Sequence, residues 1–366
     1  MGLAAHDFAS LACAPRVTLL CSKRREDAPA VASRWIWRLQ TLVRGALADA
    51  AEDVLGPAPE RDPRIWADAL KRPRDSEPLV GVEPRPRPPP KYRPSQLSVS
   101  RIDALQRDPY AVYAEYVLKL PKLDELDQEM DARHRGTAIH KALELFEENP
   151  EIGADGLAES LQAELRKAGA KPEVLLGERA ALAETARQYV EWHAGRAVAR
   201  DNVKTEIWGS YRIPRAGDLG EFKLTATADR VEIREGGAIA ILDFKTGNPP
   251  SDKEIGAGLA QQMPLQAVIA RAGGFPGVPA GEVTELTYVT VKADFKAHVI
   301  GPKKPLEKSA MELADDALAG LTRLIHGYDN PDQAYLSAPR AQFVKYEGDY
   351  GRLARRAEWT SEISDG

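Results

Sequence analysis

The stretch ILDFKTG at residues 241–247 decides the fold expected for the middle of this chain. Apolar and small residues run from Ala238 to Leu242, and the run breaks at Gly247, so the pattern predicts a buried β-strand that ends there. Residues i and i+2 of a strand point to the same face. The carboxylate of Asp243 and the ammonium of Lys245 are therefore expected side by side at the end of this strand.

A second carboxylate belongs to the run of residues before this strand. Leu224–Ala228 leads into Asp229, and the strand pattern continues to Ile233. If the two strands are neighbours, two carboxylates and one lysine meet at one place, where they could hold Mg²⁺ and orient an attacking water. Taken alone, Asp243 is more simply a turn residue before Gly and Pro, and Lys245 is a solvated side chain. The grouping with Asp229 and with the motifs below favours the metal site.

Four further side chains are candidates for the same site. His140 follows Gly136 by one helical turn, and a glycine there lets another backbone or a phosphate come close. Glu206 lies on the strand that precedes the first aspartate, and Gln262 and Gln266 share a helix face at i and i+4. Each has a simpler explanation, namely a packed or surface histidine, a solvent-facing strand glutamate, and glutamines that cap or solvate a helix.

Composition and charge are those of an ordinary globular protein. The 366 residues are 29% charged and 43% hydrophobic with a net charge of −5, which argues against a wholesale basic nucleic-acid binder and leaves local patches such as residues 84–93. Cys13 and Cys21 cannot supply a four-thiolate metal site by themselves, and a reduced, cytoplasmic protein is the simplest expectation. No apolar stretch approaches the ~20 residues of a membrane span, and no signal peptide is recognisable.

Four segments are expected along the chain. They are a segment over residues 1–55 with a strand at 16–22 and a helix from about 30 to 55, a proline-rich extended linker over 56–94, a domain of helices and strands over 95–330, and a tail over 331–366 that packs on this domain. Helices are expected from about residue 101 and at 133–148, 154–169, 173–199, 254–272 and 305–327, and strands at 203–213, 222–234, 237–245, 283–292 and 295–301. This order predicts an α/β fold with a mixed β-sheet flanked by helices.

Taken in order, these motifs resemble the RecB-type nuclease branch of the PD-(D/E)XK superfamily. The residues that carry the resemblance are the glycine–histidine helix, the strand glutamate, the first aspartate, DFKTG at 243–247 and QQMPLQA at 261–267. The resemblance covers roughly residues 95–300. It implies a restriction-endonuclease-like core and an exonuclease-type deoxyribonuclease that depends on Mg²⁺, with Mn²⁺ as an alternative ion.

The resemblance also implies a role for each candidate residue. The expected metal ligands are His140, Asp229 and Asp243; the expected catalytic residues are Asp229, Asp243, Lys245 and Glu206; and the expected DNA-binding residues are Gln262 and Gln266. Lys245 would orient or deprotonate the attacking water. Gln266 stands where the signature of the branch has tyrosine, which leaves the metal ligands intact but changes a DNA-contacting position.

The two ends of the chain are similar to the C-terminal part of the AddB family, whose members work with AddA in bacterial helicase–nuclease complexes that process double-strand breaks. Residues 2–8 with the strand expected after them, and residues 349–355, carry this likeness. It implies that residues 1–55 are the end of a helicase-like region and that the chain is a C-terminal fragment. Its partners would be an AddA-type helicase–nuclease subunit and DNA, as duplex ends or a single strand.

The sequence departs from the iron–sulfur members of this family. Asp108 stands before Pro109 and Tyr110 where those members have cysteine, and the C-terminal region has no cysteine. No iron–sulfur cluster is therefore expected, and apolar packing should hold this helix to the tail. No phosphate-loop motif occurs, so ATP hydrolysis is not expected. A catalytically silent DNA-binding or docking module of the same complex is the alternative function, and a hydrolase of another substrate is a third.

Overall fold

The structure is a computed structural model. It describes residues 2–15, 17–22, 24–25, 28–56, 62–71, 82–122, 130–196, 198–199, 202–339 and 348–360. The chain divides into two compact units, residues 1–80 and 81–366. No helix within the described ranges has the length and apolar character that a membrane crossing requires.

The first unit consists of short helices and a two-stranded ribbon. Its elements are α1 (Gly2–Ala12), β1 (Arg24–Arg25), β2 (Ala28–Pro29), α2 (Arg34–Leu47), a 3₁₀ turn (Ala48–Ala50), α3 (Ala51–Leu55) and α4 (Pro63–Lys71). The strand expected at 16–22 is not formed over 17–22, where no partner strand is paired with it. The helix expected at 30–55 is interrupted at Ala48, whose φ is 45°. Ala51 is the one buried residue among the side chains that the structure describes here.

A six-stranded mixed sheet forms the centre of the second unit, residues 81–366. Its strands are β3 (Gln96–Ser98), β4 (Val203–Pro214), β5 (Glu221–Ile233), β6 (Ile239–Lys245), β7 (Val283–Thr290) and β8 (Lys296–Ile300). The order is β3-β5-β6-β7-β8, with β4 paired along β5. The β3–β5 and β6–β7 pairs are parallel and the others are antiparallel. The prediction of an α/β fold with a mixed sheet flanked by helices is confirmed, and the arrangement is consistent with a restriction-endonuclease-like core.

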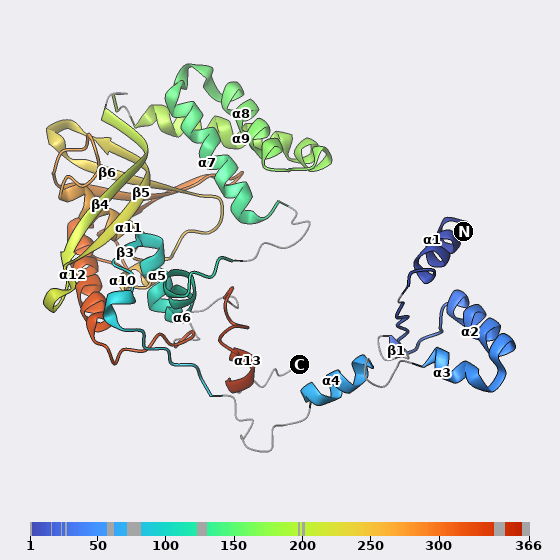
Figure 1. The fold of residues 1–366 in the computed structure, drawn as a ribbon. Coiled ribbons are helices and arrows are strands. Elements are labelled where there is room, and N and C mark those ends of the chain that lie inside the picture. Colours follow the sequence, from blue (N-terminus) through green and yellow to red (C-terminus); the bar gives the residue numbers. More distant parts are fainter. Residues whose placement is uncertain are drawn as a thin grey trace. The chain divides into compact units, whose positions relative to one another are not determined.

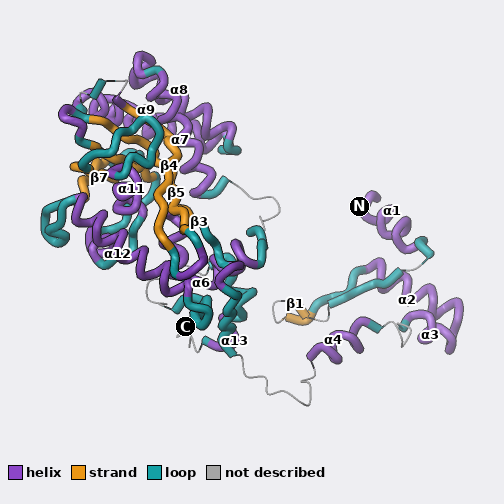
Figure 2. Tube along the Cα trace, turned by 60° about the vertical axis from the view of Figure 1, so that its left-hand side comes forward, coloured by secondary structure: helices purple, strands orange, loops and turns teal. Residues whose placement is uncertain are grey.

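Helices cover both faces of this sheet (Figures 1 and 2). The helices of the second unit are α5 (Val99–Arg107), α6 (Pro109–Val112) with a π-helical turn (Tyr113–Val117), α7 (Ala132–Glu148), α8 (Gly153–Lys167), α9 (Pro172–Gly195), α10 (Asp252–Gly256), α11 (Gln262–Arg271), α12 (Ala310–Asp329) and α13 (Arg356–Trp359). Further 3₁₀ turns span Pro90–Tyr92, Pro150–Ile152, Gly217–Leu219 and Glu235–Gly237. Figure 1 shows α7, α8 and α9 together on one side of the sheet.

Two apolar cores lie on the two faces of the sheet, and β6 contributes to both. Ile239 and Ile241 pack in the core shared with α5, α11 and α12. Leu242 and Phe244 pack in the core shared with α7, α8 and α9. Because strand residues alternate between faces, the next side chains on the α11 side are Asp243 and Lys245. The continuous apolar run seen in the sequence is the result of this burial on both faces.

Several expected boundaries differ from the observed ones. The helix expected at 254–272 is divided into α10 and α11 by a turn that contains Gly258, whose φ is 72°. The helix expected from residue 305 begins at Ala310, because Ser309 and Glu312 form a capping box there. The predicted linker 56–94 is too long, since it contains α4 and since Arg93 belongs to the second unit. The Arg93 guanidinium donates to the carbonyl oxygens of Tyr328 (2.7 Å), Asn330 (2.9 Å) and Pro331 (2.9 Å).

Hydrogen bonds, in addition to apolar packing, hold α6 to the tail of the chain. The Asp108 carboxylate accepts a bond from the Ala338 N–H at 3.1 Å, and the Tyr110 N–H donates to the Leu336 carbonyl at 3.0 Å. The Tyr110 hydroxyl also donates to the Leu353 carbonyl at 3.5 Å. The carboxylate at position 108 thus makes a direct link between this helix and the tail. The prediction named apolar packing as the link and did not include these hydrogen bonds.

Candidate active site

The candidate site forms where β6 separates from β5. The two strands pair from Ile233↔Ile239 to Arg230↔Leu242, and beyond this point the backbone of Phe244 meets side chains on this edge. The Phe244 N–H donates to Asp229 Oδ2 at 2.7 Å. Its carbonyl accepts from His140 Nε2 at 2.9 Å. The backbone of one β6 residue therefore aligns a carboxylate from β5 with an imidazole from α7.

This bond also fixes which nitrogen of His140 faces the acidic groups. Nε2 must carry the proton, because a carbonyl oxygen can only accept. Nδ1 then faces Asp229 Oδ2 at 3.6 Å and Glu206 Oε1 at 3.9 Å. In the neutral imidazole Nδ1 has the free lone pair, so the backbone bond orients His140 as a metal ligand.

The electrostatics of the cluster favour a bound positive charge. Burial and then the neighbouring carboxylate of Asp243 raise the pKa of Asp229 to about 7. Burial alone would lower the pKa of His140, but Glu206, the two aspartates and the Phe244 carbonyl raise it to about 9. Ligand atoms of His140, Glu206 and Asp229 all lie within 4.8 Å of one another. A divalent cation would relieve the repulsion between the carboxylates and would release the imidazole proton.

Glu206 reaches this cluster through an unusual backbone conformation. In the β4–β5 ladder, Thr205 pairs with Arg230 and Ile207 with Ala228, while Glu206 and Asp229 between them make no ladder pair. Glu206 has a φ of 45°, in the left-handed region that costs a non-glycine residue roughly 1–2 kcal/mol. Such strain within a strand is typical of functional positions. No glycine stands at this position, so the left-handed conformation could not be predicted from the sequence.

This strain can be measured by comparing two substitutions that both remove the carboxylate. We expect Glu206→Gly to be more stable than Glu206→Ala by about 1 kcal/mol, since glycine adopts a positive φ without a Cβ penalty. Urea unfolding of both variants measures the difference in the free energy of unfolding. Equal stabilities, or a more stable alanine variant, would show that the backbone at this position is not strained.

Asp243, Lys245 and Gln262 form a linked group on the α11 side of β6. Lys245 Nζ lies 2.6 Å from Asp243 Oδ2, and Gln262 Nε2 donates to Asp243 Oδ1 at 2.6 Å. Lys245 Nζ also donates to Gln262 Oε1 at 3.3 Å. Asp243 is 1% exposed, whereas the Lys245 side chain is 28% exposed and can reach a bound substrate. The structure therefore places six of the predicted residues in two neighbouring groups at this end of β6. One group is His140, Glu206 and Asp229, whose ligand atoms lie within 4.8 Å of one another, and the other is Asp243, Lys245 and Gln262.

Gln266 is the exception among the predicted site residues. It is fully buried, and its Nε2 donates to the Thr227 carbonyl at 3.1 Å. That carbonyl lies on the stretch of β5 between its pairings with β3 and β6, where a side chain must replace a strand partner. Gln266 consequently offers no surface to a DNA strand in this structure. Its observed contact is a link between α11 and β5.

Two charged residues outside the predicted set lie near the site. Arg230 follows Asp229 directly and is 1% exposed. Asp103, on α5, is partly buried and accepts a hydrogen bond from the Gln261 N–H at 2.9 Å. For Arg230 the alternation of the strand was an available signal, because it places Arg230 and Glu232 on one face. For Asp103 the sequence offered no signal, because its partner lies 158 residues away along the chain.

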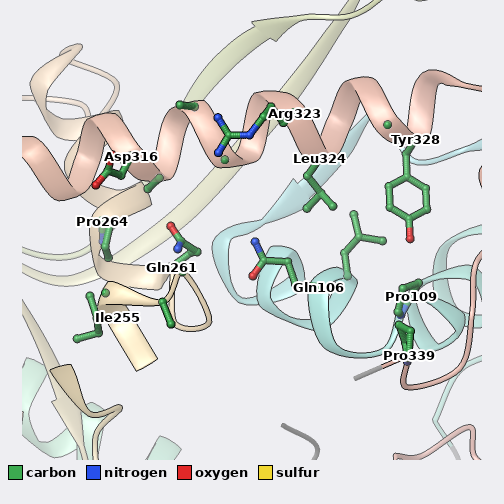
Figure 3. Close-up of a pocket in the computed structure, with 18 of the residues that line it drawn as sticks. Gln106, Pro109, Ile255, Gln261, Pro264, Asp316, Arg323, Leu324, Tyr328 and Pro339 are labelled. Atoms are coloured by element: carbon green, nitrogen blue, oxygen red, sulfur yellow. The ribbon is translucent and has the colours of Figure 1, made fainter. Parts of the chain in front are cut away.

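The site opens to solvent beside α7. A cavity of about 460 Å³ is lined by Gly136, Thr137, His140, Lys141, Glu144 and Glu206. A larger groove of about 810 Å³ lies against α5, α11 and α12 (Figure 3), and none of the predicted site residues lines it. The cavity beside His140 is therefore the place where a substrate would meet the acidic cluster.

Comparison with known proteins agrees with this geometry. A model of the PD-(D/E)XK nuclease superfamily matches residues 96–347. The chain belongs to the PD-(D/E)XK nuclease superfamily. The membership implies nuclease activity in general, and nucleases of this superfamily typically use divalent metals. The site just described combines acidic and imidazole groups of the kind that hold such ions.

Relatives of this chain occur in Rickettsia. An uncharacterized protein of Rickettsia bellii is 29% identical over 197 residues, which cover 50% of this chain and 22% of that protein. One from Rickettsia felis is 30% identical over 192 residues, again 50% of this chain and 22% of the relative. The match spans about a fifth of the length of these relatives. The crystal structure of SSO0001 aligns with 12% identity and a TM-score of 0.26, over 70% of this chain and 82% of that one, which is too weak to carry an argument.

Proposed function

We propose that this chain is a Mg²⁺-dependent deoxyribonuclease that hydrolyses phosphodiester bonds of a DNA strand, with Mn²⁺ as an alternative ion. The observation that carries the proposal is the cluster of His140, Glu206 and Asp229, whose ligand atoms lie within 4.8 Å of one another. Asp243 is next in the chain to Phe244, whose backbone bonds both His140 and Asp229. Carboxylate oxygens with one imidazole suit a hard divalent cation that keeps open positions for water and phosphate.

Each residue of the site has a specific part in this proposal. His140, Asp229 and Asp243 hold the ion, which supplies Lewis-acid stabilisation and a water of lowered pKa. Glu206 lies at the edge of the cluster, where its carboxylate can accept a hydrogen bond from the attacking water. Lys245 orients that water and stabilises the charge on the phosphate. Gln262 holds Asp243 and Lys245 in place while its exposed part faces the DNA strand.

The biological setting that we propose is a helicase–nuclease complex of the AddAB type in double-strand break repair and recombination. The support is the resemblance of residues 2–8 and 349–355 to the AddB family. In this setting the first unit ends a helicase-like region, residues 95–330 carry the chemistry, and residues 331–366 pack on them. The partner is an AddA-type subunit, the substrate is a duplex end or single strand, and the compartment is the cytoplasm.

Cleavage of linear DNA tests the nuclease directly. Purified chain is incubated with single- and double-stranded DNA in Mg²⁺ or Mn²⁺, beside an EDTA control and Lys245→Ala. Cleavage that disappears in both controls supports the proposed site. If nothing is cut, the assay is repeated with an AddA-type subunit, and activity only then indicates a partner-dependent nuclease. If no DNA is cut even with the partner, the catalytic proposal is refuted. The alternative function, a DNA-binding or docking module without catalysis, is then favoured.

Metal binding should also stabilise the fold, independently of any cleavage. At a hundredfold excess of Mg²⁺ or Mn²⁺ over its Kd, we expect the free energy of unfolding to rise by about 2.7 kcal/mol, seen as a higher Tm. Asp229→Asn should lose this shift, because Asp229 lies in the cluster. Asp294→Asn, at a loop position with 68% side-chain exposure, should keep it. An unchanged Tm of the parent chain at millimolar metal would contradict the presence of a metal site.

A further inference from the structure

Asp103 reaches the candidate site from α5, a helix that contributes none of the predicted catalytic residues. Its Oδ1 accepts the Gln261 N–H at 2.9 Å. Burial raises the pKa of Asp103 to about 6, so the group is buried as a carboxylate at neutral pH only at a cost. Lys245 acts on this carboxylate electrostatically, which places Asp103 on the same side of the sheet as the catalytic lysine.

The start of α11 needs a partner from elsewhere in the fold. Gln261 is the N-cap residue, but its side chain makes no capping hydrogen bond. The first N–H groups of a helix have no partner within the helix, and the positive end of the helix dipole favours an anion there. Asp103 supplies both an acceptor and a negative charge. The side chain of Gln261 points away into the groove of Figure 3, where it lies opposite Gln106.

Gln262 follows the N-cap residue Gln261, and its side chain links Asp243 and Lys245. Its Nε2 bonds Asp243 Oδ1 at 2.6 Å and its Oε1 accepts from Lys245 Nζ at 3.3 Å. Gln262 is the first residue of α11, so its backbone position depends directly on the neighbouring peptide that Asp103 holds. The covalent backbone from Gln261 to Gln262 therefore connects the hydrogen bond of Asp103 with the hydrogen bonds to Asp243 and Lys245.

The geometry points to Asp103 as a positioning residue of the catalytic centre. Asp103 fixes the start of α11, so that Gln262 holds the side chains of Asp243 and Lys245 in position. This inference rests on the proposed nuclease function. Asp103 does not touch the ion or the DNA; it acts through Gln262. Asp103 contributes by orienting the side chains of Asp243 and Lys245, because small displacements of a catalytic group reduce the rate strongly.

Substitution of Asp103 and Gln262, singly and together, tests the inference. We expect Asp103→Ala to lower kcat for DNA cleavage roughly tenfold to a hundredfold, with little change in KM. Asp103→Asn, which retains an Oδ1 acceptor, should recover most of the activity. Gln262→Ala should lower kcat similarly, and the double variant should be no slower than Gln262→Ala alone, because both changes break one chain of contacts.

The control is Glu312→Ala, which removes a carboxylate from the start of another helix, α12, outside the site. It should lose stability without losing kcat once the folded fraction is taken into account. If Asp103→Ala does not fold, Asp103→Ser takes its place, since its shorter side chain stays polar but does not reach the Gln261 N–H.

Additive losses in the double variant, or an unchanged kcat in folded Asp103→Ala or in Gln262→Ala, would overturn the inference. If the parent chain cuts no DNA with or without an AddA-type subunit, the proposed function fails first. The Mn²⁺ affinities of Asp103→Ala, Gln262→Ala and the double variant are then measured by calorimetry. Metal affinity is a suitable measure because Gln262 contacts the proposed ligand Asp243. Coupled losses of affinity would support the positioning role, and independent ones would refute it.

Discussion

Asp243→Asn is expected to reduce DNA cleavage by about a thousandfold or more, while the chain keeps its fold. Asp243 is the candidate ligand that also contacts the lysine and the glutamine of the site. Asparagine has the same shape, but it lacks the negative charge that a divalent ion requires. The measurement is the initial rate of cleavage of linear DNA in saturating Mg²⁺, together with Mn²⁺ binding by calorimetry. Both the cleavage of DNA and the binding of Mn²⁺ should be lost.

The fold should survive this substitution for a structural reason. The asparagine Oδ1 can still accept from Gln262 Nε2, so the buried amide keeps its partner. Lys245 loses its counterion but is 28% exposed, so water can solvate the ammonium. Circular dichroism and the Tm should therefore remain close to those of the parent chain.

The chain provides a matched control for this experiment. Asp294 and Lys296 also form an aspartate–lysine pair at i and i+2, with N···O 2.5 Å, but both side chains are 68% exposed. Asp294→Asn makes the same chemical change on the surface and should leave cleavage and metal binding unchanged. Equal cleavage by the Asp243→Asn variant and the parent chain would remove Asp243 from the chemistry and would end the metal-site proposal.

The end of β6 could be predicted from sequence because it depends on local pattern. An apolar run that stops at a glycine defines a buried strand end, and a period of two places Asp243 and Lys245 on one face. Gln262 was predicted because the local sequence QQMPLQA at 261–267 resembles a motif of the RecB-type nucleases. The break between α10 and α11 also had a local signal, Gly256 and Gly258, which the expected single helix ignored.

The parts that could not be predicted depend on contacts between distant segments. Nothing near Glu206 indicates a left-handed residue, since this conformation follows from the irregular pairing opposite Asp229. The burial of Gln266 follows from a carbonyl on β5 that has no strand partner on that side. The role of Asp103 requires α5 to pack beside α11. The functions assigned to the site residues stay predictions until the variants are measured.

Arg230→Met is expected to produce the largest loss of stability, about 3–5 kcal/mol in the free energy of unfolding. Arg230 is 1% exposed, and its guanidinium forms ion pairs with Glu147 on α7 and, at 2.9 Å, with Glu232 on β5. Methionine fills a similar volume but removes one of the cations that these buried carboxylates share. Urea unfolding followed by circular dichroism measures the effect.

The surrounding groups determine how much of this loss is compensated. Glu147 retains the Tyr189 hydroxyl at 2.8 Å and His193 Nε2 at 3.2 Å, and Glu232 retains Arg196 at 2.7 Å. Burial alone would raise the pKa of Glu147, but His193, Arg230 and Tyr189 lower it, so the carboxylate is ionised in the folded chain. Its charge is therefore left only partly paired when the guanidinium is removed.

An exposed arginine on the neighbouring strand gives the comparison. Arg212 pairs with Glu221 at 2.7 Å across β4 and β5, but the two side chains are 68% and 52% exposed. Arg212→Met should change stability by no more than about 0.5–1 kcal/mol, because exposed ion pairs contribute little. A loss for Arg230→Met as small as that for Arg212→Met would show that the buried pairs do not hold the fold together.

The stability of this buried pair also affects the geometry of the site. Glu147 lies seven residues after His140 on α7, two helical turns along the same face, and Arg230 is next to Asp229 on β5. The Arg230–Glu147 pair thus joins the two elements that carry the imidazole and the first aspartate. In folded Arg230→Met we therefore expect weaker Mn²⁺ binding, although neither partner of the pair touches the ion. Unchanged metal affinity would mean that the hydrogen bonds to the Phe244 backbone are enough to set the distance between His140 and Asp229.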